Sequence, residues 1–117
     1  MKILIVEDNA LTRSMMQALL KRLKHDVVGE AADGEAAIKA FTDLRPEAVF
    51  LDIILPRKSG MEVLCSIKKL DPAVKIVVVT AVIQKDLDKK LLDRGADAII
   101  HKPFSFEEFN DVLARLT

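Results

Sequence analysis

Residues 3–9 read ILIVEDN, an apolar run that passes directly into two acids. A strand covered on both faces of a parallel sheet is apolar throughout, whereas a strand with one face in water alternates between apolar and polar residues. Continuous apolar runs recur at residues 48–51 and 76–79, and shorter ones at 27–28 and 98–100. We therefore predict five strands in a sheet that has helices on both sides.

Amphipathic stretches of helical length separate these runs. In the first stretch Leu11, Met15, Leu19 and Leu23 recur every fourth residue, which predicts an amphipathic helix. Similar stripes follow: Ala37, Ile38 and Phe41; Met61, Leu64 and Ile67; Leu87 and Leu91; and Phe109, Val112, Leu113 and Leu116. Strands that alternate with helices indicate an α/β fold, here a single domain over residues 1–117.

Local signals mark where several helices begin and end. Ser59 precedes Glu62 by three residues, and Ser105 precedes Glu108 in the same way, so each pair predicts a capping box at a helix start. Gly95 follows the fourth stripe and is placed to end that helix in the left-handed conformation.

The composition limits the classes of function. The 18 basic and 18 acidic residues cancel, which disfavours binding to nucleic acid or to an anionic membrane surface. Cys65 is the one cysteine, so no internal disulfide can form, and its apolar surroundings predict a small core residue. There is no signal-peptide pattern and no run near the roughly 20 apolar residues of a membrane span, so we expect a cytoplasmic protein.

Polar residues follow four of the five apolar runs at their carboxyl ends, where open α/β sheets bind ligands. These residues are Glu7 and Asp8 after the first run, Asp52 after the third, Thr80 after the fourth and Lys102 after the fifth. Each has an ordinary explanation by itself, such as a turn acid, a helix cap or a surface lysine. Their joint placement at one edge of the sheet predicts a functional site.

Three gathered carboxylates repel one another unless a cation lies among them or one of them is protonated. An all-oxygen site of this kind suits Mg²⁺ (or Mn²⁺), whereas no His or Cys cluster is present for zinc. The ammonium of Lys102 and the hydroxyl of Thr80 could stabilise a phosphoryl group in transfer to a free carboxylate. The product would be an aspartyl phosphate.

The chain resembles the receiver domain of two-component response regulators over essentially its whole length. The matching pieces are residues 3–9, residues 51–56 with 59–64, residues 79–81, and residues 95–97 with 102–104. Their order and spacing form a specific signature. The resemblance implies a flavodoxin-like, three-layer (βα)5 sandwich with strand order 2-1-3-4-5, as in the chemotaxis-type example of that order.

The resemblance also implies residue roles. Asp52 would be the phosphoacceptor, and Glu7, Asp8, Asp52 and the backbone carbonyl of Ile54 would hold Mg²⁺. The phosphoryl group would come from a sensor histidine kinase or a phosphotransfer protein. The chain would then be a signalling switch and not an enzyme acting on other substrates.

By the same resemblance, Thr80 and Lys102 would contact the phosphoryl oxygens, and the bond between Lys102 and Pro103 would be cis. The switch position three residues before Lys102 often holds Tyr or Phe in the family, but here it is Ile99. We therefore expect Ile99 to repack with Thr80, with output carried by backbone shifts around Thr80 and the fourth helix.

The expected output is a protein–protein switch on the face formed by the fourth helix, fifth strand and fifth helix, which would control a partner protein or an attached output domain. Residues 81–83 could belong to this surface or could be a packed loop, and the same face could pair two copies of the chain. Ile54 and Val82 are apolar where many relatives carry polar residues, which predicts slow hydrolysis of the aspartyl phosphate.

Three other functions were weighed. A receiver-like binding module without phosphorylation would lack one of the key residues, and all are present. A phosphatase of the haloacid dehalogenase type needs a second acid at the position of Ile54. A flavodoxin needs a hydroxyl- and Gly-rich phosphate loop after the first strand, where Glu7 and Asp8 would repel the phosphate.

Overall fold

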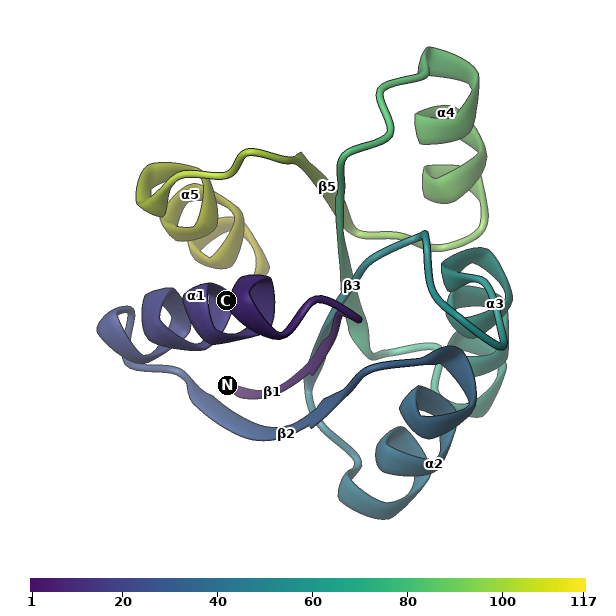
Figure 1. Ribbon diagram of the computed structural model, residues 1–117, viewed down its shortest axis with the longest axis horizontal. Helices are drawn as coiled ribbons and strands as arrows, with labels where there is room; N and C mark the ends of the chain where they lie inside the picture. The colour runs from purple at the N-terminus through teal and green to yellow at the C-terminus, as the bar shows by residue number, and fades with distance from the viewer.

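The computed structural model describes all residues, 1–117, as five strands that alternate with five helices (Figure 1). The strands are β1 (Lys2–Val6), β2 (Asp26–Ala31), β3 (Ala48–Leu51), β4 (Lys75–Thr80) and β5 (Ala98–His101). They form one parallel sheet in the order β2-β1-β3-β4-β5. This confirms the predicted α/β fold and its strand order. The second strand is longer than its apolar centre at residues 27–28 suggested.

The helices cover both faces of the sheet. They are α1 (Ala10–Arg22), α2 (Gly34–Leu44), α3 (Gly60–Leu70), α4 (Lys85–Asp93) and α5 (Phe106–Leu116). In Figure 1, α1 and α5 lie on one side of the sheet, and α2, α3 and α4 lie on the other. None of the five helices combines the length and the apolar character that a membrane-spanning helix needs.

Two hydrophobic clusters form the core, one on each face of the sheet. Phe41, Leu64 and Leu91 belong to the cluster under α2, α3 and α4. Met16 and Phe109 belong to the cluster under α1 and α5. Nearly all residues of the three central strands are buried, as continuous apolar runs predict.

The predicted apolar stripe of α1 is only partly buried, because Leu19 and Leu23 pack against the core while Leu11 and Met15 do not. Met16 and Leu20 are the buried residues of this helix, whereas Leu11 and Met15 are 71% and 51% exposed. Both pairs have helical spacing, so periodicity alone does not choose between adjacent stripes. The helix is apolar on a wider arc than the sheet can cover, which leaves Leu11 and Met15 on the surface.

The predicted helix caps are confirmed with one difference. Ser105 and Glu108 form a complete capping box, in which each side chain bonds the other residue's backbone N–H. The Ser59 hydroxyl accepts the Glu62 N–H at 3.2 Å, but the return bond to the Ser59 backbone is absent. Gly95 has φ +112°, as a glycine after a helix end allows.

Cys65 is half-buried and not a core residue, which corrects the prediction made from its apolar neighbours. Its Sγ lies 3.7 Å from a guanidinium nitrogen of Arg94 at the end of α4. The residues of α3 that enter the core are Val63, Leu64 and Ile67. Cys65 therefore lies at the edge of the apolar stripe of this helix.

Candidate functional site

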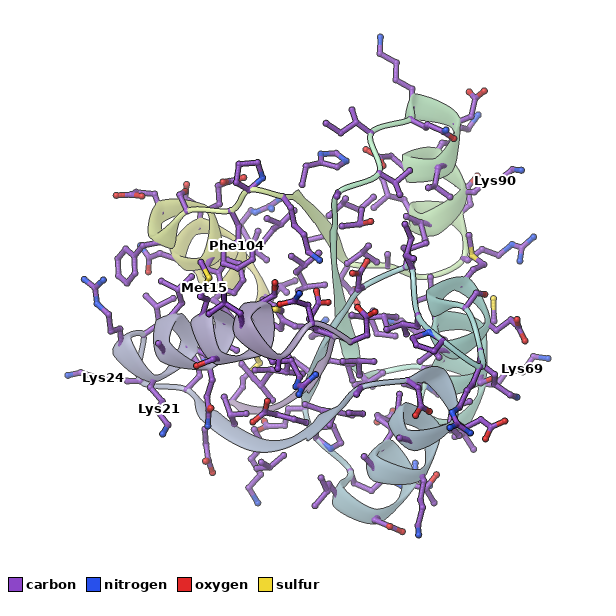
Figure 2. The ribbon with its side chains drawn as sticks, viewed as in Figure 1. Met15, Lys21, Lys24, Lys69, Lys90 and Phe104 are labelled. Carbon is purple, nitrogen blue, oxygen red and sulfur yellow. The ribbon has the colours of Figure 1, made fainter.

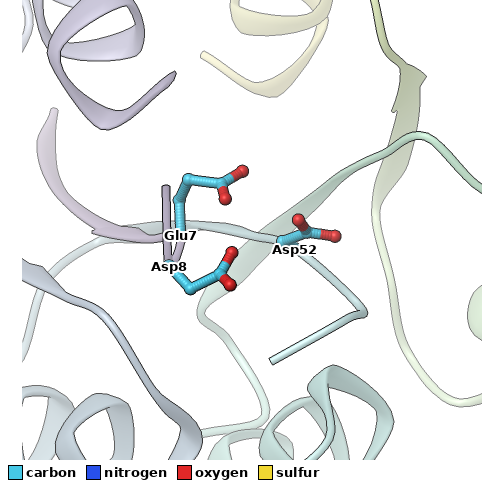
Figure 3. Close-up of side chains that lie close together, drawn as sticks. All are labelled: Glu7, Asp8 and Asp52. Carbon is cyan, nitrogen blue, oxygen red and sulfur yellow. The ribbon is translucent and has the colours of Figure 1, made fainter. Parts of the chain in front are cut away.

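Three carboxylates meet at the carboxyl end of the sheet because neighbouring strands end side by side. Val6 of β1 pairs with Leu51 of β3, so the residues that follow them lie next to each other. The Asp52 N–H donates to the Val6 carbonyl at 3.0 Å, which holds the two strand ends together. One carboxylate oxygen from each of Glu7, Asp8 and Asp52 lies within 4.8 Å of the other two (Figure 3).

Lys102 enters this cluster from the end of β5. Its Nζ donates to Glu7 Oε1 at 2.5 Å and to Asp52 Oδ2 at 2.9 Å. The Lys102 N–H donates to the Thr80 carbonyl at 2.8 Å, so its backbone is tied to the end of β4. The peptide bond between Lys102 and Pro103 is cis, as predicted. The lysine thus joins two acids that are far apart in the sequence.

Burial distinguishes the three acids. Glu7 and Asp52 are 1% and 6% exposed, whereas Asp8 is open to solvent. Burial raises the pKa of Glu7, and the hydrogen bonds from Lys102 and from the Asn9 N–H only partly oppose this rise. For Lys102, burial by itself would lower the pKa, but the hydrogen bonds to Glu7 and Asp52 outweigh it and the pKa is raised. The ammonium therefore stays charged beside the acids.

The second oxygen of Asp52 is held by the loop after β3. Oδ1 accepts a hydrogen bond from the Ile54 N–H at 3.2 Å, and the Ile54 side chain is 61% exposed beside it. Gly60, the first residue of α3, donates its N–H to the Ile53 carbonyl at 2.8 Å and packs against the backbone of Asp52. Gly60 is a support of the site that was not predicted from the sequence. Its position just after a helix cap was the available signal.

Thr80 is fully buried at the end of β4, close in the fold to Lys102. Its Oγ1 accepts the Val82 N–H at 3.3 Å and makes no hydrogen bond to Asp52 in this structure. Ile99 packs against the hydrophobic cluster under α2, α3 and α4, and His101 bonds Asp88 of α4 through Nε2 at 3.1 Å. The end of β5 is therefore joined both to the acidic site and to α4.

The donor set fits Mg²⁺. At 4.8 Å two carboxylates repel each other by about 3.5 kcal/mol at an effective dielectric constant near 20, and one ammonium cannot neutralise three acids. Oxygen donors with room for water suit Mg²⁺. The two histidines take no part, since His25 Nδ1 lies 3.0 Å from the amino terminus and His101 pairs with Asp88.

A comparison with protein families matches residues 3–114 to the response regulator receiver domain. The chain belongs to this family. Receiver domains are the signalling switches of two-component systems, and the family uses Mg²⁺. The acidic cluster of Glu7, Asp8 and Asp52 fits such a magnesium site.

Several relatives are similar along nearly their whole length. The chemotaxis protein CheY of Thermotoga maritima is 34% identical over 103 residues, covering 88% of this chain and 86% of that protein. CheY of Listeria monocytogenes is 32% identical over 115 residues, covering 98% and 97%. A crystal structure of Borrelia burgdorferi CheY in a complex with CheX, BeF₃ and Mg²⁺ has a TM-score of 0.92 at 26% identity, covering 98% of this chain and 87% of that one.

An apolar groove runs from the acidic site along α1. One part, of about 200 Å³, is lined by Thr12, Met15, Lys102, Pro103 and Phe104. The next part, of about 310 Å³, shares Met15 and Phe104 and continues to Arg22 and Phe106. Figure 2 shows Met15 on α1 and Phe104 on the segment before α5 close together.

Proposed function

We propose that the chain accepts a phosphoryl group on Asp52 from a phosphohistidine and changes conformation to control a partner protein or an attached output domain. The observation that carries this proposal is the environment of Asp52. A nearly buried carboxylate is held between a charged lysine and two further acids at the carboxyl edge of the sheet.

In the proposed reaction an Asp52 oxygen attacks the phosphorus of the donor. The new O–P bond forms as the P–N bond breaks, and the donor imidazole keeps the electron pair. Lys102 Nζ, already 2.9 Å from Asp52 Oδ2, would stabilise the charge on the phosphoryl oxygens. Because Lys102 stays protonated, it acts as a fixed cation and not as an acid.

Glu7, Asp8 and Asp52, with the Ile54 carbonyl, are the proposed ligands of Mg²⁺ (or Mn²⁺). When bound, the ion would neutralise charge on the acids and on the phosphoryl group. Glu7 is the most buried of the three and is already hydrogen-bonded to Lys102 and to the Asn9 N–H. We therefore expect it to contact the ion through water, while the exposed Asp8 binds directly.

The donor is proposed to be a sensor histidine kinase or a phosphotransfer protein that docks in the groove along α1. Met15 and Phe104 line both parts of the groove, and the part next to the acidic site is also lined by Lys102. The ring of Phe104 packs on Phe109 at a centroid distance of 4.9 Å, which fixes the groove wall. A helix lying in this groove would bring a histidine to the acidic site.

The switch is proposed to link Thr80 to α4 without an aromatic side chain. A phosphoryl group on Asp52 would give the Thr80 hydroxyl a stronger acceptor than its present environment, so Thr80 and residues 81–83 would shift. Ile99 would repack beneath it. The bond between His101 and Asp88 would pass the shift of the β5 end to α4.

The surface that reads this switch is proposed to be the face of α4, β5 and α5. Ile83 is 74% exposed and Leu92 is 51% exposed, so apolar side chains are available on the α4 side. A target protein or a second copy of the chain could bind there. The neutral overall charge gives no reason to expect nucleic acid as the direct partner.

Beryllofluoride with Mg²⁺ tests the proposed function because it stands in for a phosphoryl group. When beryllofluoride is added, we expect the amide chemical shifts of Asp52, Thr80 and residues 81–93 to change. In Asp52→Asn we expect no such change. No shift in the native chain would contradict the proposed function. Shifts confined to the acidic site would support phosphoryl binding but contradict the proposed coupling to α4.

A further inference from the structure

Arg13 lies beside the acidic site but contacts none of its three carboxylates. Its Nη1 donates to the Glu7 carbonyl at 2.7 Å and to the Asp8 carbonyl at 3.2 Å. Its Nε lies 3.3 Å from Oε1 of Glu30 on β2, and its side chain is only 21% exposed. One guanidinium thus joins α1, the loop after β1, and β2.

We propose that Arg13 is a positioning residue that holds the backbone of Glu7 and Asp8 in the geometry that binds a divalent cation. This inference rests on the proposed function of the same site. The planar guanidinium can donate to two carbonyls and one carboxylate at the same time, which a lysine ammonium does less well. The two peptide groups that carry the acids are therefore fixed before a cation arrives.

The contacts of Arg13 differ from those of Lys102. Lys102 donates to the carboxylates themselves and so occupies oxygens that a cation could use. Arg13 donates only to main-chain oxygens there, and leaves the carboxylate lone pairs free. Its charge also lies near the acids without neutralising them by direct contact. Arg13 can thus order the site without competing for its ligand atoms.

The two possible roles of Arg13, a nearby positive charge or a support of the loop, predict opposite effects of Arg13→Gln on cation affinity. If the arginine acts only as a nearby positive charge, its removal strengthens cation binding, because one repulsion is lost. If it positions the loop, its removal weakens binding. Supporting residues around metal sites typically contribute 10-fold or more to affinity, so we expect Arg13→Gln to bind Mg²⁺ about tenfold more weakly.

Isothermal titration calorimetry with MgCl₂, repeated with MnCl₂, measures this affinity without any phosphorylation. Arg22→Gln is the matched control, since it removes the same charge from the same helix. The Arg22 guanidinium lies over the Phe106 ring at 4.3 Å and does not contact the loop after β1. Urea unfolding of each variant reports whether the fold persists.

Weaker binding in Arg13→Gln and Arg13→Lys, with native affinity in Arg22→Gln, would support the inference. Unchanged or tighter binding in Arg13→Gln, or native affinity in Arg13→Lys, would overturn it. Arg13→Lys keeps the charge, and remains a test if the glutamine variant does not fold. If the native chain binds neither cation, the proposed function fails and this inference with it, whereas native binding with unchanged variants overturns only the inference.

Discussion

Gly60→Ala is a sensitive test of how the fold positions Asp52, the proposed phosphoacceptor. Gly60 begins α3, and a Cβ at this position would lie 2.2 Å from the Asp52 carbonyl oxygen and 2.4 Å from the Ile53 Cα. Both are backbone atoms, so no side-chain rotation can relieve the contact. The substitution must move either the start of α3 or the peptide group that carries Asp52.

The size of the effect follows from these distances. Ordinary van der Waals contact begins at 3.4 Å, so the two elements must separate by about 1 Å. Overpacking of this kind costs about 1–3 kcal/mol, so the variant remains folded if its stability is typical of domains. A displacement of about 1 Å at a reacting group can slow a reaction about 100-fold. We therefore expect a large loss of phosphorylation rate with a modest loss of stability.

The assay is the rate of phosphorylation by acetyl phosphate and Mg²⁺, with urea unfolding followed by circular dichroism. Gly29→Ala is the matched control, because its Cβ would meet the Cδ1 of Leu44, the end of a side chain that is 42% exposed. This control should phosphorylate at the native rate. A native rate in Gly60→Ala would refute the reasoning that the packing of α3 fixes Asp52.

Three further predictions concern charge and lifetime. Lys102→Met leaves Glu7 and Asp52 buried without the lysine ammonium that pairs with them. The free energy of unfolding, measured in EDTA, should therefore fall by about 3 kcal/mol. Mg²⁺ should restore more stability to this variant than to the native chain, and equal gains would contradict the proposed site. Burial, and then the amino-terminal charge, lower the pKa of His25 from 6.5. Between the lowered value and pH 6.5 the unfolded state binds more protons, so stability should fall as the pH drops through this window. In His25→Asn the stability measured by urea unfolding should fall less over this pH window. A fall as large as in the native chain would exclude His25 as the cause. The aspartyl phosphate should decay slowly with Mg²⁺ present, because Ile54 and Val82 offer no polar group to orient water, and a lifetime of only seconds would contradict this.

Much of the fold could be predicted because strands buried on both faces leave a clear pattern. The apolar runs at residues 3–6, 48–51 and 76–79 correctly predicted three strands, which the structure shows buried in the sheet. Periodicity gave no strand order, which came only from the resemblance to a family. The buried face of α1 could not be predicted, because Leu11 and Met15 have the same spacing as Met16 and Leu20. Which stripe is buried depends on the position of the sheet and of α5.

The acidic site could be predicted to a similar extent. Residues that end neighbouring parallel strands meet at one edge, so Glu7, Asp8, Asp52 and Lys102 were found from their positions alone. The hydrogen bonds of Arg13 could not be predicted, because they join side-chain nitrogens to backbone oxygens that any residue carries. Such contacts depend on three-dimensional geometry and leave no residue pattern.

Intact-mass measurement after incubation with acetyl phosphate tests the central claim, that Asp52 accepts the phosphoryl group. We predict that the native chain gains the mass of one phosphoryl group when Mg²⁺ is present, and gains none in EDTA. Asp52→Asn should gain none, while Asp33→Asn, in which the substituted acid caps α2 at the helix start, should gain one. No gain in the native chain, or a full gain in Asp52→Asn, would contradict the assignment of Asp52 as the phosphoacceptor.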